Sequence, residues 1–226
     1  MAPPRAAAPR APAPPKPLLV TVDVVIFTLR DASALEVLLV RRKYPPFAGR
    51  WAVPGGFVLE HESLDDAAER ELREETGVAD VYLEQLHAFG EPRRDPRGRV
   101  VTVAYYALVA AGRLPLKAGS DAADARWFDA GAPPALAFDH RAIFDFALAR
   151  LRAGVEGSAL AFRLLPPTFT LTELQRVHEA VLGRPLDKRN FRRRALSLGL
   201  VRPLREWRRE GQSRPAQLFR PAALPG

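Results

Sequence analysis

The sequence contains no cysteine. This absence excludes disulfide bonds, thiolate zinc sites and cysteine nucleophiles, and nothing indicates an oxidising compartment. Uninterrupted apolar runs are also missing. No stretch approaches the roughly 18 residues of a membrane-spanning helix, and the N-terminus has no apolar core of the kind that signal peptides carry. We therefore expect a soluble, cytoplasmic protein with no membrane partner.

Acidic residues are scarce in the C-terminal third of the chain. Residues 161–226 hold 14 basic and 5 acidic side chains and carry a net charge of +9, whereas residues 21–160 carry −4. The chain as a whole carries +8. The basic charge is therefore concentrated in one region of the sequence and is not spread evenly along it.

Composition divides the chain into a tail and two domains. A chain of 226 residues, 47% of them apolar, can bury one core of ordinary size and still form a small second module. Residues 1–17 are mostly proline and alanine and predict a disordered tail. Residues 18–153 predict one domain and residues 160–222 a second. The stretch at residues 154–158 predicts a linker between them.

Hydrophobic runs predict strands and helices in alternation within residues 18–153. Strands are expected at residues 21–27, 35–42, 81–89, 99–110 and 125–128. The apolar residues of segment 140–152 recur at helical spacing, so a helix is expected there. Strands mixed with helices in this way favour an α/β sandwich.

One segment, residues 56–78, fits a strict pattern, G-x5-E-x7-R-E-U-x-E-E-x-G-U, in which U is a bulky aliphatic residue. Chance agreement at all nine specified positions is negligible. These positions are Gly56, Glu62, Arg70, Glu71, Leu72, Glu74, Glu75, Gly77 and Val78.

Local signals predict a helix over residues 64–76 of this segment. Ser63 followed by Asp66 is a capping-box start, and Gly77 suits the left-handed conformation that ends a helix. The face expected to pack on the sheet consists of Leu64, Ala67, Ala68 and Leu72.

Three carboxylates lie close together on another face of this helix. Glu71, Glu74 and Glu75 are three or four residues apart, which places them within about 6 Å of one another. Such a cluster repels itself unless a cation lies among its members, and Mg²⁺ prefers oxygen ligands of this kind. Arg70 can pair with one glutamate and hold its rotamer. The alternative is an acidic helix face exposed to solvent.

The segment resembles the Nudix hydrolases, which split the diphosphate bond of nucleoside diphosphate derivatives with Mg²⁺ or Mn²⁺. The resemblance covers roughly residues 20–150 and implies an α/β/α sandwich with a mixed sheet. It implies catalytic and metal-binding roles for Glu71, Glu74 and Glu75, with the Gly56 carbonyl as a further metal ligand. Glu62 and Arg70 would support the catalytic loop and helix.

The general base varies within the family and is sometimes an acidic residue in a later loop. Asp121 and Asp124 are candidates for this role, although aspartates before a strand are often turn formers.

The stretches RWAVPGGFV and EPRRDPRGRVV look like those of ADP-ribose-type Nudix proteins. Arginine forks match phosphate groups, and aromatic rings stack on bases, so either Trp51 or Phe47 is a candidate for contact with adenine. For each residue the alternative is a surface arginine or a core aromatic. The residues assigned to substrate binding are Arg41, Arg42, Arg50, Trp51, Gly55, Gly56 and Arg97.

The basic C-terminal region predicts two helices followed by a hairpin. Thr170 or Thr172 caps the first helix, and Asp187 caps a second one whose buried face carries Phe191, Ala195 and Leu198. A strand begins near Val201, and the hairpin that follows has a basic tip. The tip residues are Arg208, Arg209 and Arg214.

Two helices and a basic hairpin are typical of a winged helix-turn-helix, in which the second helix enters the DNA major groove. The alternative is a basic helical hairpin that docks on the first domain or on RNA. The residues expected to contact double-stranded DNA are Lys188, Arg189, Asn190, Arg192, Arg193, Arg194 and Arg214.

Over residues 19–220 the chain resembles the Nudix-related transcriptional regulators of NAD metabolism. This resemblance implies a homodimer that binds DNA and senses ADP-ribose or a related NAD derivative. In many members the catalytic box has decayed, whereas here it is intact, so hydrolysis to AMP and ribose 5-phosphate is chemically available. Three hypotheses follow: a regulator that also hydrolyses its ligand, a pyrophosphatase with a basic accessory domain, and a catalytically silent sensor.

Overall fold

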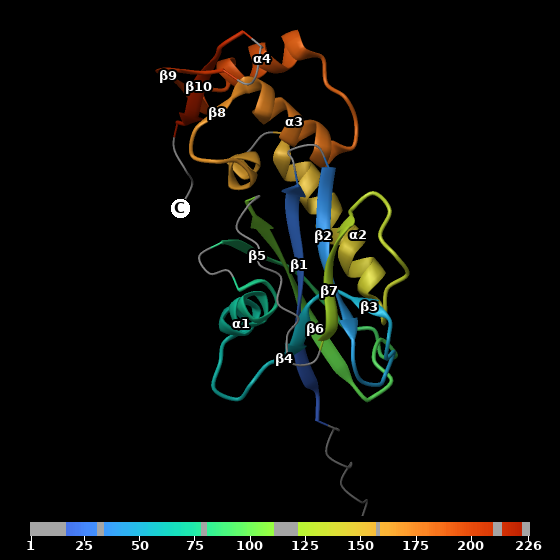
Figure 1. Cartoon of the computed structure of the whole chain (residues 1–226). Coiled ribbons are helices and arrows are strands. Elements are labelled where there is room, and N and C mark those ends of the chain that lie inside the picture. Colours follow the sequence, from blue (N-terminus) through green and yellow to red (C-terminus); the bar gives the residue numbers. More distant parts are fainter. Residues whose placement is uncertain are drawn as a thin grey trace, which may run out of the picture.

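The computed structural model describes residues 17–30, 34–77, 81–110, 122–156, 159–209 and 214–222 (Figure 1). The expected tail, apart from Pro17, lies outside these residues, as do Val78 and Asp121. Among the described residues, no helix combines the length and the apolar character of a membrane span.

A seven-stranded mixed sheet forms the larger part of the molecule. Its central strands β1 and β6 are parallel, and the other strand pairs are antiparallel. The order is β3-β2-β1-β6-β5, with β4 paired to β1 and β7 paired to β2. The strands are β1 (Leu19–Arg30), β2 (Ala34–Arg42), β3 (Trp51–Ala52), β4 (Gly55–Phe57), β5 (Tyr82–Phe89), β6 (Val100–Val109) and β7 (Ala122–Asp129).

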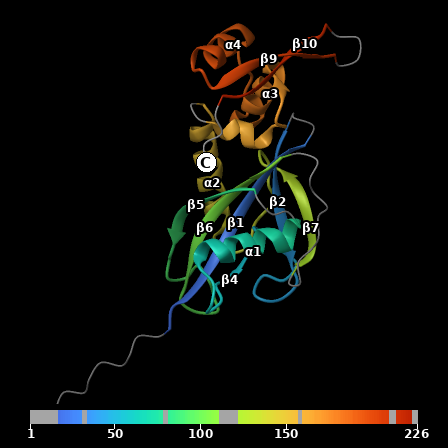
Figure 2. The same cartoon turned by 90° about the vertical axis from the view of Figure 1, so that its left-hand side faces the viewer.

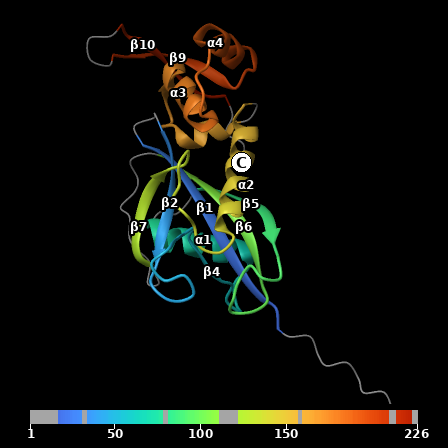
Figure 3. The same cartoon turned by 90° about the vertical axis from the view of Figure 1, so that its right-hand side faces the viewer.

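Two helices cover opposite faces of this sheet, α1 (Leu64–Thr76) and α2 (His140–Val155) (Figures 2 and 3). Strand β1 is buried on both faces because its side chains alternate between them. Val22, Val24 and Ile26 pack with Ala67, Ala68 and Leu72 of α1, whereas Val25, Phe27 and Leu29 belong to the cluster that contains α2. The expected α/β/α sandwich is confirmed.

Helix α2 continues into the stretch that was expected to be a linker. Its last residue, Val155, is 1% exposed and lies in a hydrophobic cluster that also contains Phe162, Phe169 and Val177. Burial of Val155 keeps residues 154 and 155 helical, and residues 157 and 158 lie outside the described part of the chain. One continuous core therefore connects the sheet to the C-terminal region.

The C-terminal region is a winged helix. Helices α3 and α4 pack beside a three-stranded sheet of order β8-β10-β9 (Figure 1). The 3-10 helix η1 and the two-residue strand β8 were not predicted because they are too short to show periodicity. The elements are η1 (Ala159–Leu164), β8 (Phe169–Thr170), α3 (Leu171–Leu182), α4 (Lys188–Ser197), β9 (Val201–Arg208) and β10 (Ala216–Pro221).

Capping residues set the ends of α3 and α4. Of the two candidate threonines, Thr170 caps α3, in a capping box with Glu173, and Gly183 ends that helix with φ 68°. Asp187 caps α4 as expected. The expected burial of Leu198 is wrong, since the helix ends at Ser197 and the Leu198 side chain is 49% exposed.

Candidate functional site

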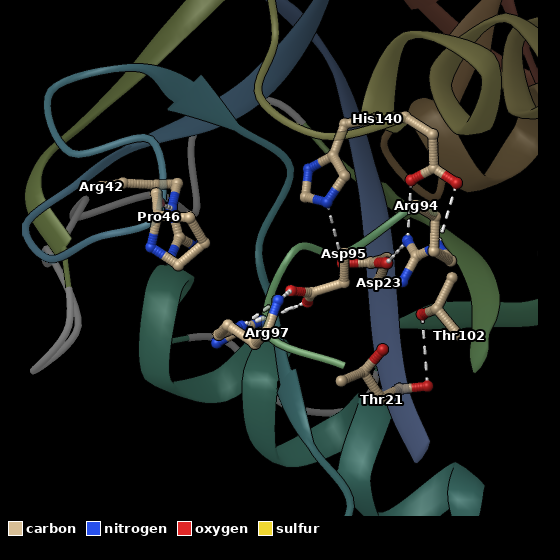
Figure 4. Close-up of polar contacts among 10 residues, drawn as sticks. Thr21, Asp23, Arg42, Pro46, Arg94, Asp95, Arg97, Thr102 and His140 are labelled. Carbon is tan, nitrogen blue, oxygen red and sulfur yellow. Dashed lines mark hydrogen bonds and ion pairs between the residues drawn. The ribbon is translucent and has the colours of Figure 1, made fainter. Parts of the chain in front are cut away.

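A cavity of about 410 Å³ opens between α1, β1 and the start of α2. Its polar lining comes from segments that are far apart in the sequence (Figure 4). Both acidic and basic side chains face it, so the cavity can accept metal ions and anions together. The charged lining residues are Asp23, Arg42, Arg70, Glu71, Glu74, Glu75, Arg94, Asp95 and Arg97.

Helix α1 begins and ends where the sequence predicted. The Ser63 hydroxyl accepts from the Asp66 backbone N–H at 3.1 Å, the Asp66 carboxylate accepts from the Ser63 N–H, and Gly77 adopts φ 68°. This register turns all three glutamates of the box toward the cavity. Glu71 and Glu75 are each 8% exposed, whereas Glu74 is exposed.

Arg70 connects the helix to the loop before it. Its guanidinium donates to Glu71 Oε1 at 2.7 Å and to both oxygens of Glu62 at 2.8 and 3.0 Å. Glu62 also accepts from the Leu59 N–H at 2.8 Å. The Arg70 hydrogen bond, followed by that of Leu59, lowers the pKa of Glu62 to about 2. Arg70 and Glu62 therefore hold the Glu71 carboxylate in a fixed position.

Glycine is required at the turn beside Glu71 because a side chain would not fit there, and not because the backbone adopts an unusual conformation. A Cβ atom on Gly56 would lie 2.1 Å from Glu71 Oε1, and one on Gly55 would lie 2.4 Å from the Val22 carbonyl oxygen. Both distances are far shorter than van der Waals separation. The Glu71 carboxylate thus rests directly against the Gly56 backbone.

The carboxylates around Gly56 offer only oxygen donors, which suits a hard divalent cation. Burial raises the pKa of Glu71 and the hydrogen bond from Arg70 opposes this, so Arg70 compensates the buried carboxylate only in part. No three acidic or histidine side chains of the described residues converge closely enough to hold a metal ion by themselves. Backbone carbonyl, water or phosphate oxygens would have to complete the coordination, as is usual for Mg²⁺.

Buried charges at the opposite wall were not predicted from the sequence. Arg94 is 4% exposed at its side chain and donates to Asp139 at 2.8 and 2.9 Å and to Asp23 at 3.3 Å (Figure 4). These partners lie 45 and 71 residues away, so no local pattern could reveal them. The charged turn EPRRDPRG was the only available signal.

His140 also lines this wall, although no histidine was assigned a role from the sequence. Its Nδ1 accepts from the Val53 N–H at 3.1 Å, which leaves the proton on Nε2, 3.5 Å from Asp23 Oδ1. Burial lowers the pKa of His140, so the ring is neutral at pH 7.

Thr21 lines the cavity and carries a buried hydroxyl. The residue is 7% exposed, and its Oγ1 is one of the buried side-chain atoms that have no partner in the described structure. A buried polar group without a partner is costly, and in native proteins it calls for an explanation. A ligand group that bonds to Thr21 would remove this cost.

The predicted substrate residues divide into two groups. Arg42, Gly55, Gly56 and Arg97 line the cavity. Arg42 and Arg97 both lie over the ring of Phe138, at 4.7 and 5.7 Å from its centroid. Their charges therefore converge on one aromatic side chain that the sequence did not indicate.

The other predicted substrate residues lie outside the cavity lining. Arg41 donates to the Gly49 carbonyl at 3.0 Å, Arg50 is exposed, and Trp51 packs edge-to-face on Phe128 at 4.8 Å. Trp51 is half-buried, pairs with β2 and packs against the core cluster on the α2 side.

Two further candidate residues also lie away from the cavity lining. Phe47 packs on the edge of Phe138, with the ring centroids 4.8 Å apart. Asp124 pairs with Arg126 at 2.7 Å. The two residues were candidates for adenine contact and for the general base, respectively.

The candidate DNA-contacting surface is α4. Every basic side chain of α4 is exposed, as is Arg214 at the base of the wing. Several of the expected basic residues also make bonds within the protein. Arg192 donates to the Thr172 hydroxyl at 3.4 Å, and Arg193 donates to Asn190 Oδ1 at 3.0 Å. Arg194 donates to the Glu156 carbonyl at 3.0 Å, and Arg208, at the end of β9, pairs with Glu173.

Comparison with known proteins identifies both parts of the chain. The NUDIX domain family matches residues 17–146, and the NrtR DNA-binding winged helix domain matches residues 161–220. The crystal structure of Shewanella oneidensis NrtR complexed with a 27mer DNA superposes with a TM-score of 0.78, at 39% identity over 89% of this chain and 93% of that one. The chain belongs to the NrtR family of Nudix proteins. The winged helix and the cavity are thus the two parts of an NrtR-type chain.

Two relatives with assigned roles bear on the Nudix and winged-helix parts. The ADPR responsive transcriptional repressor NtrR of Acinetobacter baylyi is 41% identical over 91% of this chain and 82% of that protein. The ADP-ribose pyrophosphatase of Methanocaldococcus jannaschii is 44% identical over 48% of this chain and 63% of that protein. This NrtR-type chain therefore resembles a repressor over most of its length and an enzyme over about half of it.

Proposed function

We propose that this protein is an ADP-ribose-responsive transcriptional regulator of NAD metabolism whose Nudix domain also hydrolyses its ligand. The observation that carries this proposal is the intact carboxylate set Glu71, Glu74 and Glu75, turned toward a cavity with convergent arginines, in a chain whose other domain exposes an arginine-rich helix. We assign the Nudix domain to residues 18–153 and the winged helix to residues 160–222.

The cavity suits a nucleoside diphosphate derivative. Arg42 and Arg97 lie over one ring, and a guanidinium fork matches phosphate oxygens bidentately. A diphosphate placed between them would also approach the carboxylates of α1. ADP-ribose, named in both relatives, has such a diphosphate between two riboses.

For hydrolysis, the Glu71 and Glu75 carboxylates and the Gly56 carbonyl would hold Mg²⁺ or Mn²⁺, with Glu74 at the solvent side. Such an ion, when bound, activates water and neutralises phosphate charge. Arg70 keeps the Glu71 rotamer in place through the hydrogen bonds described above. The products would be AMP and ribose 5-phosphate.

For DNA binding, α4 is expected to enter the major groove with Lys188, Arg189, Asn190, Arg192 and Arg193, and Arg214 of the wing to reach the phosphate backbone. A homodimer would place two such helices against half-sites about one DNA turn apart. Ligand binding would shift the two winged domains out of this spacing.

Two measurements on the full chain test the ligand part of this proposal. Calorimetry with ADP-ribose is expected to show binding, and incubation with ADP-ribose and Mg²⁺ is expected to release AMP and ribose 5-phosphate. Binding without cleavage would favour the catalytically silent sensor. Cleavage by a protein that enriches no duplex from a random DNA pool would favour the pyrophosphatase with a basic accessory domain. Absence of binding would contradict the proposal.

Thr21→Val is expected to weaken ADP-ribose binding about 3- to 10-fold, which is the usual worth of one hydrogen bond, without lowering the melting temperature. The valine removes a hydroxyl that has no partner within the described part of the protein, so the fold is not weakened. Calorimetry and thermal melting measure the two effects. Thr28→Val is the matched control on the same strand, because its hydroxyl donates to the Val109 carbonyl away from the cavity. The control should lower stability and keep the parent affinity, and the same pattern in Thr21→Val would contradict the assignment.

The double substitution Arg192→Ala and Arg193→Ala is expected to flatten the salt dependence of DNA binding by about 1 to 2 units of log K against log salt. Both side chains are exposed on α4, and each phosphate that the variant leaves unneutralised keeps about one condensed counterion on the DNA. Anisotropy titrations at several salt concentrations, with a duplex enriched by the protein from a random pool, measure the slope. Arg73→Ala with Arg141→Ala removes the same charge from exposed positions on α1 and α2 and should leave the slope unchanged. Equal slopes in the parent and the α4 variant would favour the docking alternative.

A further inference from the structure

Helix α2 begins at the wall of the cavity. The residue before it, Asp139, accepts two hydrogen bonds from Arg94, and its first residue, His140, accepts one from the Val53 N–H. Arg94, Val53 and His140 all line the cavity, whereas Asp139 does not. The N-terminal end of α2 is thus bonded to cavity residues through a largely buried ion pair.

The other end of α2 is bonded to both helices of the winged domain. Arg152 donates through Nε to the Val181 carbonyl in the last turn of α3, at 3.0 Å. Glu156, the C-cap of α2, accepts from Arg184 through its carboxylate at 2.9 Å and from Arg194 of α4 through its carbonyl at 3.0 Å. One helix therefore contacts the ligand cavity at its first turn and the DNA-contacting helix at its last.

The two ends are joined by a rigid element. An α-helix of 16 residues is about 24 Å long, and α2 is packed along its length in the core cluster that continues into α3. Figure 3 shows α2 running along the sheet up to the winged domain. A close-packed helix of this kind moves as a unit, so a shift at its first turn reaches its last.

Arg94 is the residue on which a ligand can act. Its guanidinium binds Asp139 bidentately at one edge and faces the cavity, where it also reaches Asp23. A diphosphate offers the same bidentate acceptor geometry as a carboxylate and carries more charge. A diphosphate bound in the cavity would therefore compete with Asp139 for Arg94.

We propose that α2 transmits occupancy of the cavity to α4, and that ADP-ribose acts on it by drawing Arg94 away from Asp139. Release of Asp139 frees the first turn of α2. The last turn then shifts, and the contact between Glu156 and Arg194 of α4 changes with it. This inference rests on the proposed function, because it requires that ADP-ribose weakens DNA binding.

The test is the ratio of the DNA dissociation constants with and without saturating ADP-ribose, measured by anisotropy on the enriched duplex. In the parent protein this ratio is expected to be about 10 or more. Asp139→Asn removes the charge that competes for Arg94 while keeping the size of the side chain. Its ratio is expected to fall below about 3, while calorimetry still shows ADP-ribose binding because Asp139 does not line the cavity.

Arg152→Gln repeats the test from the other end of α2, at an exposed position where folding is not at stake, and its ratio is also expected to fall below about 3. Asp145→Asn is the matched control, since it breaks the exposed Arg141–Asp145 pair on the same helix and should keep the parent ratio. If either Asp139→Asn or Arg152→Gln has the same ratio of DNA dissociation constants as the parent protein, the proposal that α2 transmits occupancy of the cavity is wrong. A ratio of one in the parent itself would overturn the proposed function instead.

Discussion

Glu75→Gln is expected to lower kcat/KM for ADP-ribose cleavage by on the order of 100-fold or more in the presence of Mg²⁺. Glu75 is 8% exposed and lines the cavity one helical turn from Glu71, so a cation bound in the cavity would meet its charge. The amide keeps the size of the side chain and removes the charge. Release of AMP, measured by chromatography, reports the rate.

Glu69→Gln is the control for this variant, because Glu69 is exposed on the same helix and does not line the cavity. It should cleave ADP-ribose at the parent rate. Cleavage by Glu75→Gln at the parent rate would show that the carboxylate set of α1 does not act in the reaction, and the enzymatic part of the proposal would then be wrong.

Gly56→Ala is expected to reduce kcat/KM about 100-fold, because misplacing a reacting group by about 1 Å costs that much. The added Cβ would lie 2.1 Å from Glu71 Oε1, so either the carboxylate or the β4 backbone must move. Movement of Glu71 also breaks its 2.7 Å hydrogen bond with Arg70. Affinity for the enriched duplex without ligand should stay unchanged, since α4 lies far from this turn in the fold (Figure 1).

Gly98→Ala serves as the matched substitution, because a Cβ at Gly98 meets no atom within 4 Å. It should keep the parent kcat/KM within about twofold, as exposed substitutions generally do. Equal activity of the two alanine variants would mean that the close approach of Gly56 to Glu71 has no part in catalysis.

Local signals explain why helix α1 was predictable. The Ser63–Asp66 capping box and Gly77 set both ends of α1, and the periodicity between them fixes which side chains face the sheet. The same reasoning found α3 and α4 through Thr170, Gly183 and Asp187. Each of these features depends on residues within a few positions of one another.

Contacts between distant segments were not predictable in the same way. Arg94 is surrounded by partners from β1 and from the start of α2, and a charged turn alone does not reveal a buried triad. The contact of Trp51 with Phe128 depends on the pairing of β2 with β3 and β7, which no local pattern reveals. The guanidinium groups of Arg42 and Arg97 lie over the ring of Phe138, and no sequence pattern indicated this contact.

The contacts of the basic side chains in the C-terminal region were also not predictable from the sequence. The sequence correctly indicated an arginine-rich second helix, but it could not show that Arg194 bonds to the end of α2 or that Arg208 pairs with Glu173. The first contact depends on how the winged domain packs against α2 and the second on how β9 packs against α3, so both are tertiary features.

The most direct test of the central claim is the affinity of the full-length protein for its enriched DNA duplex with and without ADP-ribose. Fluorescence anisotropy is measured on the parent and on Glu75→Gln, so that cleavage cannot remove the ligand during the titration. The account predicts that saturating ADP-ribose weakens DNA binding by about 10-fold or more in both proteins. Unchanged DNA affinity, while calorimetry on the same samples shows that ADP-ribose is bound, would contradict it.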